Sequence, residues 1–206
     1  MSRFAQLAFT DGVRAQQKAH GSDRAYRRAL DDTGGPDRLG PHERAFIAER
    51  DSFYLATVGE TGWPYIQHRG GPRGFLRVMD DHTLGFADFR GNRQYITLGN
   101  LDHDDRVSLF LMDYARQTRL KILGRARVAD GERGLAVPDY RAKVEREVLI
   151  SVEGFDWNCQ QHIPQLFPRD AVESTLGQLQ DRVDALVREN TQLRAAATSA
   201  RVRPVD

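Results

Sequence analysis

A change of hydrophobic period at residue 53 is the feature that most constrains the fold of this chain. From there to residue 129, apolar and polar side chains alternate in short runs with turn-forming residues between them. The six runs are FYLATVG (53–59), WPYIQHR (63–69), FLRVMD (75–80), LGFADF (84–89), VSLFLMD (107–113) and RLKILGRARVA (119–129). A period of two is typical of strands that bury one face. The pattern therefore predicts a mainly β fold, an antiparallel barrel or sandwich.

The connections between these runs also carry signals. GETG (59–62) and DDH (80–82) have the composition of tight hairpin turns. We expect one helix inside the strand region, in NRQYITLGNL (92–101). Beyond residue 130, PDYRAKVEREVLISVEGFDW (138–157) predicts a helix followed by a strand, and NCQQHIPQLFP (158–168) predicts an irregular segment.

The chain divides by composition into three parts. Residues 1–40 are polar and dotted with glycine, and we interpret them as an N-terminal arm with a short helix in 14–30. Residues 41–169 form the strand-rich domain, which opens with a short helix at 41–50 because Pro41 suits a first helical position. Residues 170–206 are interpreted as a C-terminal helix.

That C-terminal part carries a heptad repeat. Its members, spaced seven apart in two series, are Leu176, Val183, Asn190 and Ala197, and then Leu179, Leu186 and Leu193. Valine and leucine seams with one asparagine favour a parallel two-stranded coiled coil, in which the two asparagines bond across the axis. The alternative is an amphipathic helix that packs on its own barrel. Asp170 and Glu173 are expected to cap the start.

Composition excludes several classes of protein. Thirty Lys and Arg against twenty-nine Asp and Glu give a net charge of +1, so the basic surface of a nucleic-acid binder is missing. The single cysteine, Cys159, rules out an intramolecular disulfide, and the start lacks the apolar region of a signal peptide. No eighteen apolar residues run together. We therefore expect a soluble, cytoplasmic protein with no membrane or nucleic-acid partner.

The segment RGNRQ (90–94) has the composition of an anion-binding turn. Gly91 permits a backbone conformation that other residues resist, and the amides beyond it can point at a ligand as the next helix begins. Arg93 offers a guanidinium suited to phosphate, while Asn92 and Gln94 offer neutral donors. The turn predicts a phosphate ligand, and the alternative is an ordinary exposed loop.

The sequence predicts no metal site. No two of its histidines have the spacing of a metal-binding helix, and Cys159 with His162 supplies only two of the three or four ligands required. Cys159 has no base beside it in sequence and is not expected to be a nucleophile. Since no carboxylate or histidine has a spacing that assigns acid or base work, catalytic residues stay unassigned.

The ordered set of segments resembles the split-barrel flavin-binding proteins related to pyridoxamine 5′-phosphate oxidase. The likeness covers residues 45–130. It rests on FYLATVGETGWPYIQHR as first hairpin, TLGFADFRGNRQYITLGNL as strand, turn and helix, DDRVSLFLMDY as next strand, and RLKILGRARV with its late Gly124. The resemblance implies a six-stranded antiparallel split β-barrel with flanking helices, FMN as cofactor, and a homodimer with the flavin between two barrels.

The resemblance also implies roles for single residues. Arg93 matches one of the basic pair that holds the FMN phosphate, and Gln94 stands where many relatives have lysine. Asp88 takes the place of a threonine or serine near the flavin, and Arg119 falls near a glutamine directed at the isoalloxazine.

Two further positions carry alternatives. A second basic contact is expected from the second or third strand, where the candidates are Gln67, His68 and Arg69, with Arg77 as alternative. His68 could equally be a surface residue. Trp157 could stack beside the flavin of a partner subunit or plug the end of its own barrel.

Two functions from different classes follow from the resemblance. The first is an FMN-dependent oxidoreductase acting on a small molecule in a cleft at the dimer interface. The second is a non-catalytic module that holds a flavin, haem or another phosphorylated cofactor and assembles through its coiled coil. The arginine and histidine that follow a tryptophan in a true pyridoxamine-phosphate oxidase are absent after residue 170, so we do not expect that substrate.

Overall fold

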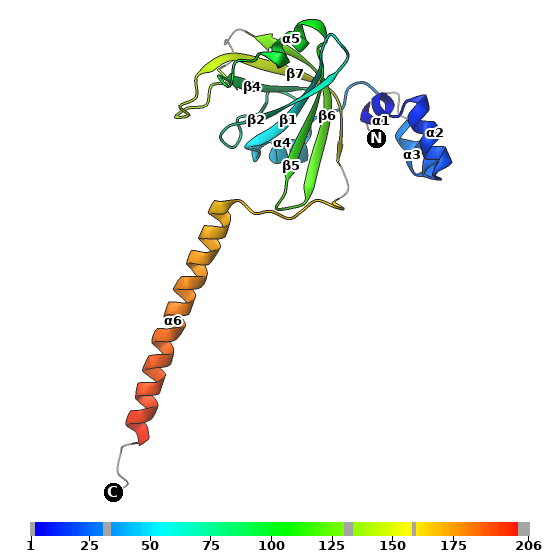
Figure 1. Cartoon of the computed structure of the whole chain (residues 1–206). Coiled ribbons are helices and arrows are strands. Elements are labelled where there is room, and N and C mark those ends of the chain that lie inside the picture. Colours follow the sequence, from blue (N-terminus) through cyan, green and yellow to red (C-terminus); the bar gives the residue numbers. More distant parts are fainter. Residues whose placement is uncertain (1–2, 31–33, 130–133, 158–159, 202–206) are drawn as a thin grey trace. The chain divides into compact units, whose positions relative to one another are not determined.

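The computed structural model describes residues 3–30, 34–129, 134–157 and 160–201 of this 206-residue chain (Figure 1). They fall into two compact units, Met1–Ile163 and Pro164–Asp206, and each is described here by itself.

One antiparallel sheet of seven strands forms the body of the first unit, with the order β2-β1-β5-β6-β7-β4-β3. In chain order the strands are β1 (Ser52–Val58), β2 (Pro64–Gly70), β3 (Arg77–Val78), β4 (Thr83–Phe89), β5 (Arg106–Asp113), β6 (Thr118–Ala129) and β7 (Val144–Trp157). The prediction of a mainly β, antiparallel fold with flanking helices and a long C-terminal helix is confirmed. All six predicted strands are present, and both hairpin turns join the strands they were expected to join.

The sheet differs from the prediction in two strands: β7 is longer than expected and β3 is shorter. β7 lies in the segment expected to be a helix and then a strand, and no helix precedes it among residues 134–143. Pro138 lacks a backbone donor and Asp139 is left-handed, with φ of 61°, so both oppose a helix there. β3 has two residues instead of six, because Phe75 and Leu76 are consecutive and both enter the core, which breaks the alternation.

The core lies inside the curled sheet, where alternate side chains of each strand meet. Among the fully buried side chains are Phe53, Leu55, Phe86, Leu109, Leu111, Leu120 and Ile122. Gly124 allows β6 and β7 to shift register, because a Cβ at this position would lie 2.6 Å from the Ser151 carbonyl oxygen.

The helix α4 (Pro41–Ala48) confirms the short helix predicted at 41–50, and it contributes Phe46 and Ile47 to this core. Just beyond it, the buried Arg50 guanidinium donates to the Asp113 carboxylate at 2.8 Å and to the Met112 carbonyl at 2.8 Å. This contact ties the end of α4 to the end of β5.

Within the described residues 3–30 and 34–40 there are three short helices where one was predicted: α1 (Arg3–Ala8), α2 (Asp11–Ala19) and α3 (Asp23–Leu30). α2 and α3 are separated at Gly21, which has φ of 72°. α1 packs on β7, where the Asp37 carboxylate accepts from the backbone amides of Arg3 at 2.8 Å and Phe155 at 3.0 Å.

The second unit consists of an irregular start and one helix, α6 (Arg169–Arg201), drawn orange to red in Figure 1. α6 begins at Arg169, so Asp170 lies inside the helix and the predicted capping pair of Asp170 and Glu173 is not formed. Glu173 instead accepts a hydrogen bond from Arg169 Nε at 2.7 Å. Cys159 lies outside the described residues. In the part of the chain that the structure describes, no helix combines the length and apolarity needed to cross a membrane.

Candidate functional site

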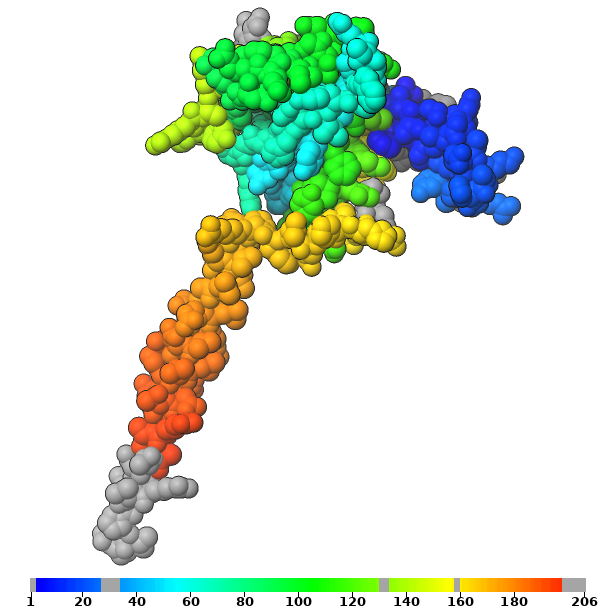
Figure 2. All heavy atoms as spheres, in the orientation of Figure 1, coloured from blue at the N-terminus to red at the C-terminus, as the bar shows by residue number. Residues whose placement is uncertain are grey.

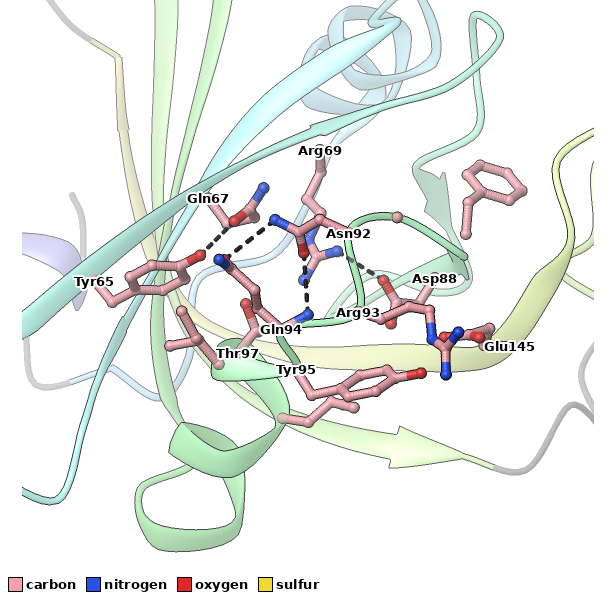
Figure 3. A pocket seen from close by; sticks show the side chains of 14 residues that line it. Tyr65, Gln67, Arg69, Asp88, Asn92, Arg93, Gln94, Tyr95, Thr97 and Glu145 are labelled. Atoms are coloured by element: carbon pink, nitrogen blue, oxygen red, sulfur yellow. Dashed lines mark hydrogen bonds and ion pairs between the residues drawn. The ribbon is translucent and has the colours of Figure 1, made fainter.

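A pocket of about 170 Å³ opens where β4 ends and the chain turns into α5 (Ile96–His103) (Figure 3). Its lining comes from β2, from the end of β4, from the turn and start of α5, and from β7. These residues are Tyr65, Gln67, Arg69, Asp88, Phe89, Gly91, Asn92, Arg93, Gln94, Tyr95, Ile96, Thr97, Leu98 and Glu145.

The turn owes its shape to two left-handed residues, Arg93 with φ of 62° and Tyr95 with φ of 53°. Gly91 does not have a positive φ, so the sequence interpretation that gave this role to Gly91 was wrong. Non-glycine residues in this region cost about 1–3 kcal/mol each and are concentrated at ligand sites. Asn92 Oδ1 accepts from the backbone amide of Gln94 at 3.2 Å, which supports the turn from inside.

The start of α5 supplies backbone donors to the pocket. The helix begins at Ile96, four residues later than the sequence indicated, and no side chain caps it at Tyr95. The first amides of a helix have no carbonyl partner within it, and they carry the positive end of the helix dipole. An anion is the natural ligand at this position.

An arginine and an aspartate form the buried wall of the pocket. Arg69 Nη1 lies 2.7 Å from Asp88 Oδ1, and Arg146 Nη1 lies 3.7 Å from Asp88 Oδ2. Burial raises the pKa of the Asp88 carboxyl, although both guanidiniums act to lower it. Arg69 Nε and Arg146 Nη1 are buried without a hydrogen-bond acceptor among the described residues. The wall therefore contains one donor, Arg69 Nε, that protein groups leave unused, whereas Arg146 lies outside the pocket lining.

Arg93 lies on the exposed side of the pocket, and Glu145 lines the pocket from β7 with a side chain that is only 11% exposed. Arg90 Nε lies 2.7 Å from Glu145 Oε1, and this bond, with the charges of Arg146 and Arg93, lowers the pKa of Glu145. Arg93 makes no hydrogen bond or ion pair within the described ranges, so its guanidinium is available to a ligand.

The structure gathers six of the nine predicted site residues around this pocket: Gln67, Arg69, Asp88, Asn92, Arg93 and Gln94. Figure 3 shows Gln67 bonded to Tyr65, Arg69 bonded to Asp88, and Asn92 bonded to Gln94 around the pocket.

The other three lie elsewhere in this chain. His68 faces the opposite side of β2, with its ring 5.7 Å from that of Tyr54. Arg119 on β6 lies over the Phe110 ring at 5.8 Å. Trp157 ends β7, where its indole donates to Glu43 Oε1 at 2.8 Å.

Trp157 also packs edge-on against the Phe46 ring at 4.8 Å, the arrangement expected of a residue that closes the barrel. The alternative basic residue, Arg77, donates to the carbonyls of Gly134 at 3.0 Å and Ala136 at 3.1 Å. Any contact of Trp157 with a partner's cofactor stays a prediction.

Sequence reasoning missed Tyr65, Tyr95, Glu145 and Arg146. For Tyr65 the signal was present: alternation in WPYIQHR places it on the same face as Gln67, and its hydroxyl donates to that side chain. Glu145 and Arg146 come from β7, and no local pattern could place them beside a turn more than fifty residues earlier.

The ionisable groups of the pocket are mostly paired. Both of its carboxylates, Asp88 and Glu145, contact arginines. No three His, Cys, Asp or Glu side chains gather as a metal site would require within the described residues. The site thus has the character of an anion cradle rather than of an acid–base centre.

Comparison with known proteins identifies the family. Residues 39–179, more than half of the chain, match the family model described as pyridoxamine 5′-phosphate oxidase. The chain belongs to this family. No curated protein is a significant match.

Solved structures similar to this pyridoxamine 5′-phosphate oxidase family member are distant. A putative pyridoxamine 5′-phosphate oxidase from Lactobacillus delbrueckii is 22% identical, with 58% of this chain and 93% of that one covered and a TM-score of 0.44. An FMN-binding protein from Syntrophomonas wolfei is 15% identical, with 70% and 96% covered and a TM-score of 0.41. HutZ, the haem storage protein from Vibrio cholerae, is 20% identical, with 58% and 94% covered and a TM-score of 0.38. These likenesses carry no argument about function.

Proposed function

We propose that this pocket binds the phosphate of FMN and that the protein is a flavin-dependent oxidoreductase acting on a small molecule. The observation that carries the proposal is the left-handed turn, which presents an unpaired Arg93 at the uncapped start of α5. Backbone strain of this kind persists only where the surrounding structure stabilises it, and it is concentrated at ligand-binding sites.

The donors of the pocket fit a phosphate. Arg93 would contribute a charge-assisted bond from the exposed side, and the first amides of α5 would contribute neutral ones. Arg69 Nε, which is buried without an acceptor, adds a donor on the buried side. Tyr65 and Gln67 stand next to this cradle and offer polar groups suited to the hydroxyls of a ribityl chain.

The pocket is too small to enclose a whole flavin. Its volume of about 170 Å³ falls below the roughly 300–1,000 Å³ of clefts that bury drug-sized ligands. A second copy of the chain would complete the site, which supports a homodimer.

The outer face of the sheet offers a surface for that second copy. Ile66 is 65% exposed and Tyr54 is 38% exposed there. His68 and Arg119 lie on this same face, because His68 pairs with Tyr54 and Arg119 stacks over Phe110. In such a dimer these two side chains are available to the partner's cofactor.

Bound FMN would supply the hydride and electron chemistry, as flavins do in other proteins. The chain's own residues would bind and orient it. Because both pocket carboxylates are paired with arginines, the same geometry also favours a second candidate, a module that holds a flavin, haem or another phosphorylated cofactor without turnover.

A comparison of FMN with riboflavin tests the phosphate site. Arg93→Ala should weaken FMN binding about ten- to hundredfold, since a charge-assisted hydrogen bond contributes about 1.5–3 kcal/mol. Riboflavin, which lacks the phosphate, should bind both proteins equally in a fluorescence titration. Arg127→Ala removes an exposed arginine of β6 outside the pocket and serves as the matched control. Unchanged FMN affinity in Arg93→Ala would show that the turn is an ordinary loop.

Anaerobic reduction separates the two candidate functions. FMN-loaded protein that is bleached by NAD(P)H under argon is an oxidoreductase. Protein that binds FMN but is reduced only by dithionite does not use nicotinamide donors, a result that favours the carrier, and mass spectrometry of the protein as purified identifies which cofactor it carries.

A further inference from the structure

The helix α6 carries an apolar stripe that nothing in its own unit covers. Its exposed apolar side chains are Val172, Leu176, Leu179, Val183, Leu186, Val187 and Leu193, and Figure 2 shows the helix surface in orange and red. Leu193 is 64% exposed and Leu176 is 60% exposed. Helices of soluble proteins owe most of their stability to burial of such a stripe, so α6 requires a partner surface.

The spacing of the stripe specifies what kind of surface covers it. One series runs through Leu176, Val183, Asn190 and Ala197, and the other through Val172, Leu179, Leu186 and Leu193. Val172 extends the second series by one heptad to the start of the helix, and α6 is continuous through Gly177. A strict repeat of seven keeps both series facing a second helix only if the two helices supercoil.

We infer that α6 pairs with α6 of a second copy of this chain, parallel and in register, as a two-stranded coiled coil. This assembly is independent of the proposed flavin function, because none of its residues lines the pocket.

Asn190 sets the direction of the pair. In a parallel, in-register pair each residue of the first series faces its own counterpart, so the two Asn190 amides meet and bond to each other. In the antiparallel pair with full overlap, the first series faces the second, and Asn190 lies against Leu179. Two buried amides would then lose their partners, a loss that protein interiors avoid.

The charged residues beside the seam can pair with a second copy of α6 in either the parallel or the antiparallel direction. They do not decide between the two directions, and Asn190 does. In the parallel pair, Glu189 flanks the seam opposite Arg194 of the other helix. In the antiparallel pair, Glu189 would flank Arg182. Each arrangement is self-complementary, since both members of every pair come from the same sequence, as a two-fold interface requires.

Disulfide trapping in the full chain tests the inference. In a Cys159→Ser background, Leu186→Cys should form a covalent dimer under mild oxidation, because parallel register brings residue 186 next to its own counterpart. Arg188→Cys, on the outer side of the helix, is the matched control. We expect cross-linking at least tenfold faster for Leu186→Cys than for Arg188→Cys, measured by non-reducing electrophoresis.

Two further variants keep the test decisive. Ala197→Cys is a mild change in the other series and should also cross-link to itself, even if Leu186→Cys disturbs the helix. In an antiparallel pair residue 186 meets residue 183, so a mixture of Val183→Cys and Leu186→Cys proteins would cross-link faster than either protein alone. That outcome overturns the parallel pair. Equal, slow cross-linking of all variants overturns the coiled coil and places α6 on its own barrel or on another protein.

Discussion

Replacing Asp88 with asparagine should strengthen FMN binding, although it removes a buried ion pair. The Asp88 carboxylate occupies Arg69 Nη1 at 2.7 Å and brings a negative charge to a pocket that we propose for an anion. Its side chain is only 10% exposed, so water screens that charge weakly. Asparagine keeps a neutral acceptor for Arg69 but carries no charge, so the positive charge of the Arg69 guanidinium is no longer offset and its donors turn more readily to an anionic ligand.

The size of the effect follows from one Arg69 donor that can exchange a weak, neutral acceptor for the charged ligand. A hydrogen bond from a charged group contributes about 1.5–3 kcal/mol, which corresponds to about ten- to hundredfold tighter FMN binding. Riboflavin should bind the variant and the parent protein equally. Asp105→Asn is the matched control, because Asp105 pairs with Arg125 at 2.6 Å on the surface and both side chains are about half exposed.

The pH dependence gives a second, independent readout. Burial raises the pKa of Asp88 above its ordinary value of 3.8, so the parent carboxyl becomes neutral as pH falls through that raised value. The parent protein then resembles the variant. We therefore expect the ratio of the two FMN affinities to be largest near pH 7 and to approach one in acid.

This ratio is informative because titration of the FMN phosphate itself affects both proteins alike and cancels. The measurement is a fluorescence titration of FMN from pH 8 down to about pH 4, which reaches the ordinary range of an aspartic acid. Unchanged or weaker FMN binding by Asp88→Asn would refute the reasoning and show that Asp88 holds Arg69 in position for the ligand.

Two other outcomes are expected. Burial alone would raise the pKa of Glu43, but bonds from Trp157 and the Gly40 amide hold it below its ordinary 4.5, so this carboxylate stabilises the fold above pH 4.5 and ceases to do so as pH falls through its lowered pKa. Glu43→Gln should thus lower the melting temperature at pH 7 and have less effect in acid, as Trp157 fluorescence can record. A chain that ends at residue 169 should still sediment as a dimer, whereas a monomer would show that α6 alone assembles the protein.

The strands could be predicted from sequence because alternation is a local property that burial of one face imposes. The exception shows the limit of that reasoning. In the segment 138–157, residues with high helix propensity such as Arg141, Ala142 and Lys143 suggested a helix. The left-handed Asp139 opposes a helix there, and pairing with both β4 and β6 stabilises the extended strand β7.

The candidate site was predictable only in part, for a similar reason. The residues of the turn could be predicted because they are consecutive in sequence. The β2 side chains could be predicted because they alternate onto one face of a strand. The left-handed conformations of Arg93 and Tyr95 were not, since such a conformation in a non-glycine residue is imposed by tertiary context. The sequence pattern assigned the unusual backbone conformation of the turn to Gly91 instead.

The pairing of β4 with β7 has a consequence for synthesis of the protein. β4 carries Asp88 and leads into the turn, yet its main neighbour in the sheet, β7, is translated about sixty residues later. At roughly 5–20 residues per second, the ribosome needs about 3–12 s to supply Arg146 after Asp88. During that interval the residues of the turn have been synthesised, but the strand β7 that pairs with β4 has not. Nascent chains arrested before residue 144 should therefore not retain phosphate ligands, and release of β7 would be the event that creates the site.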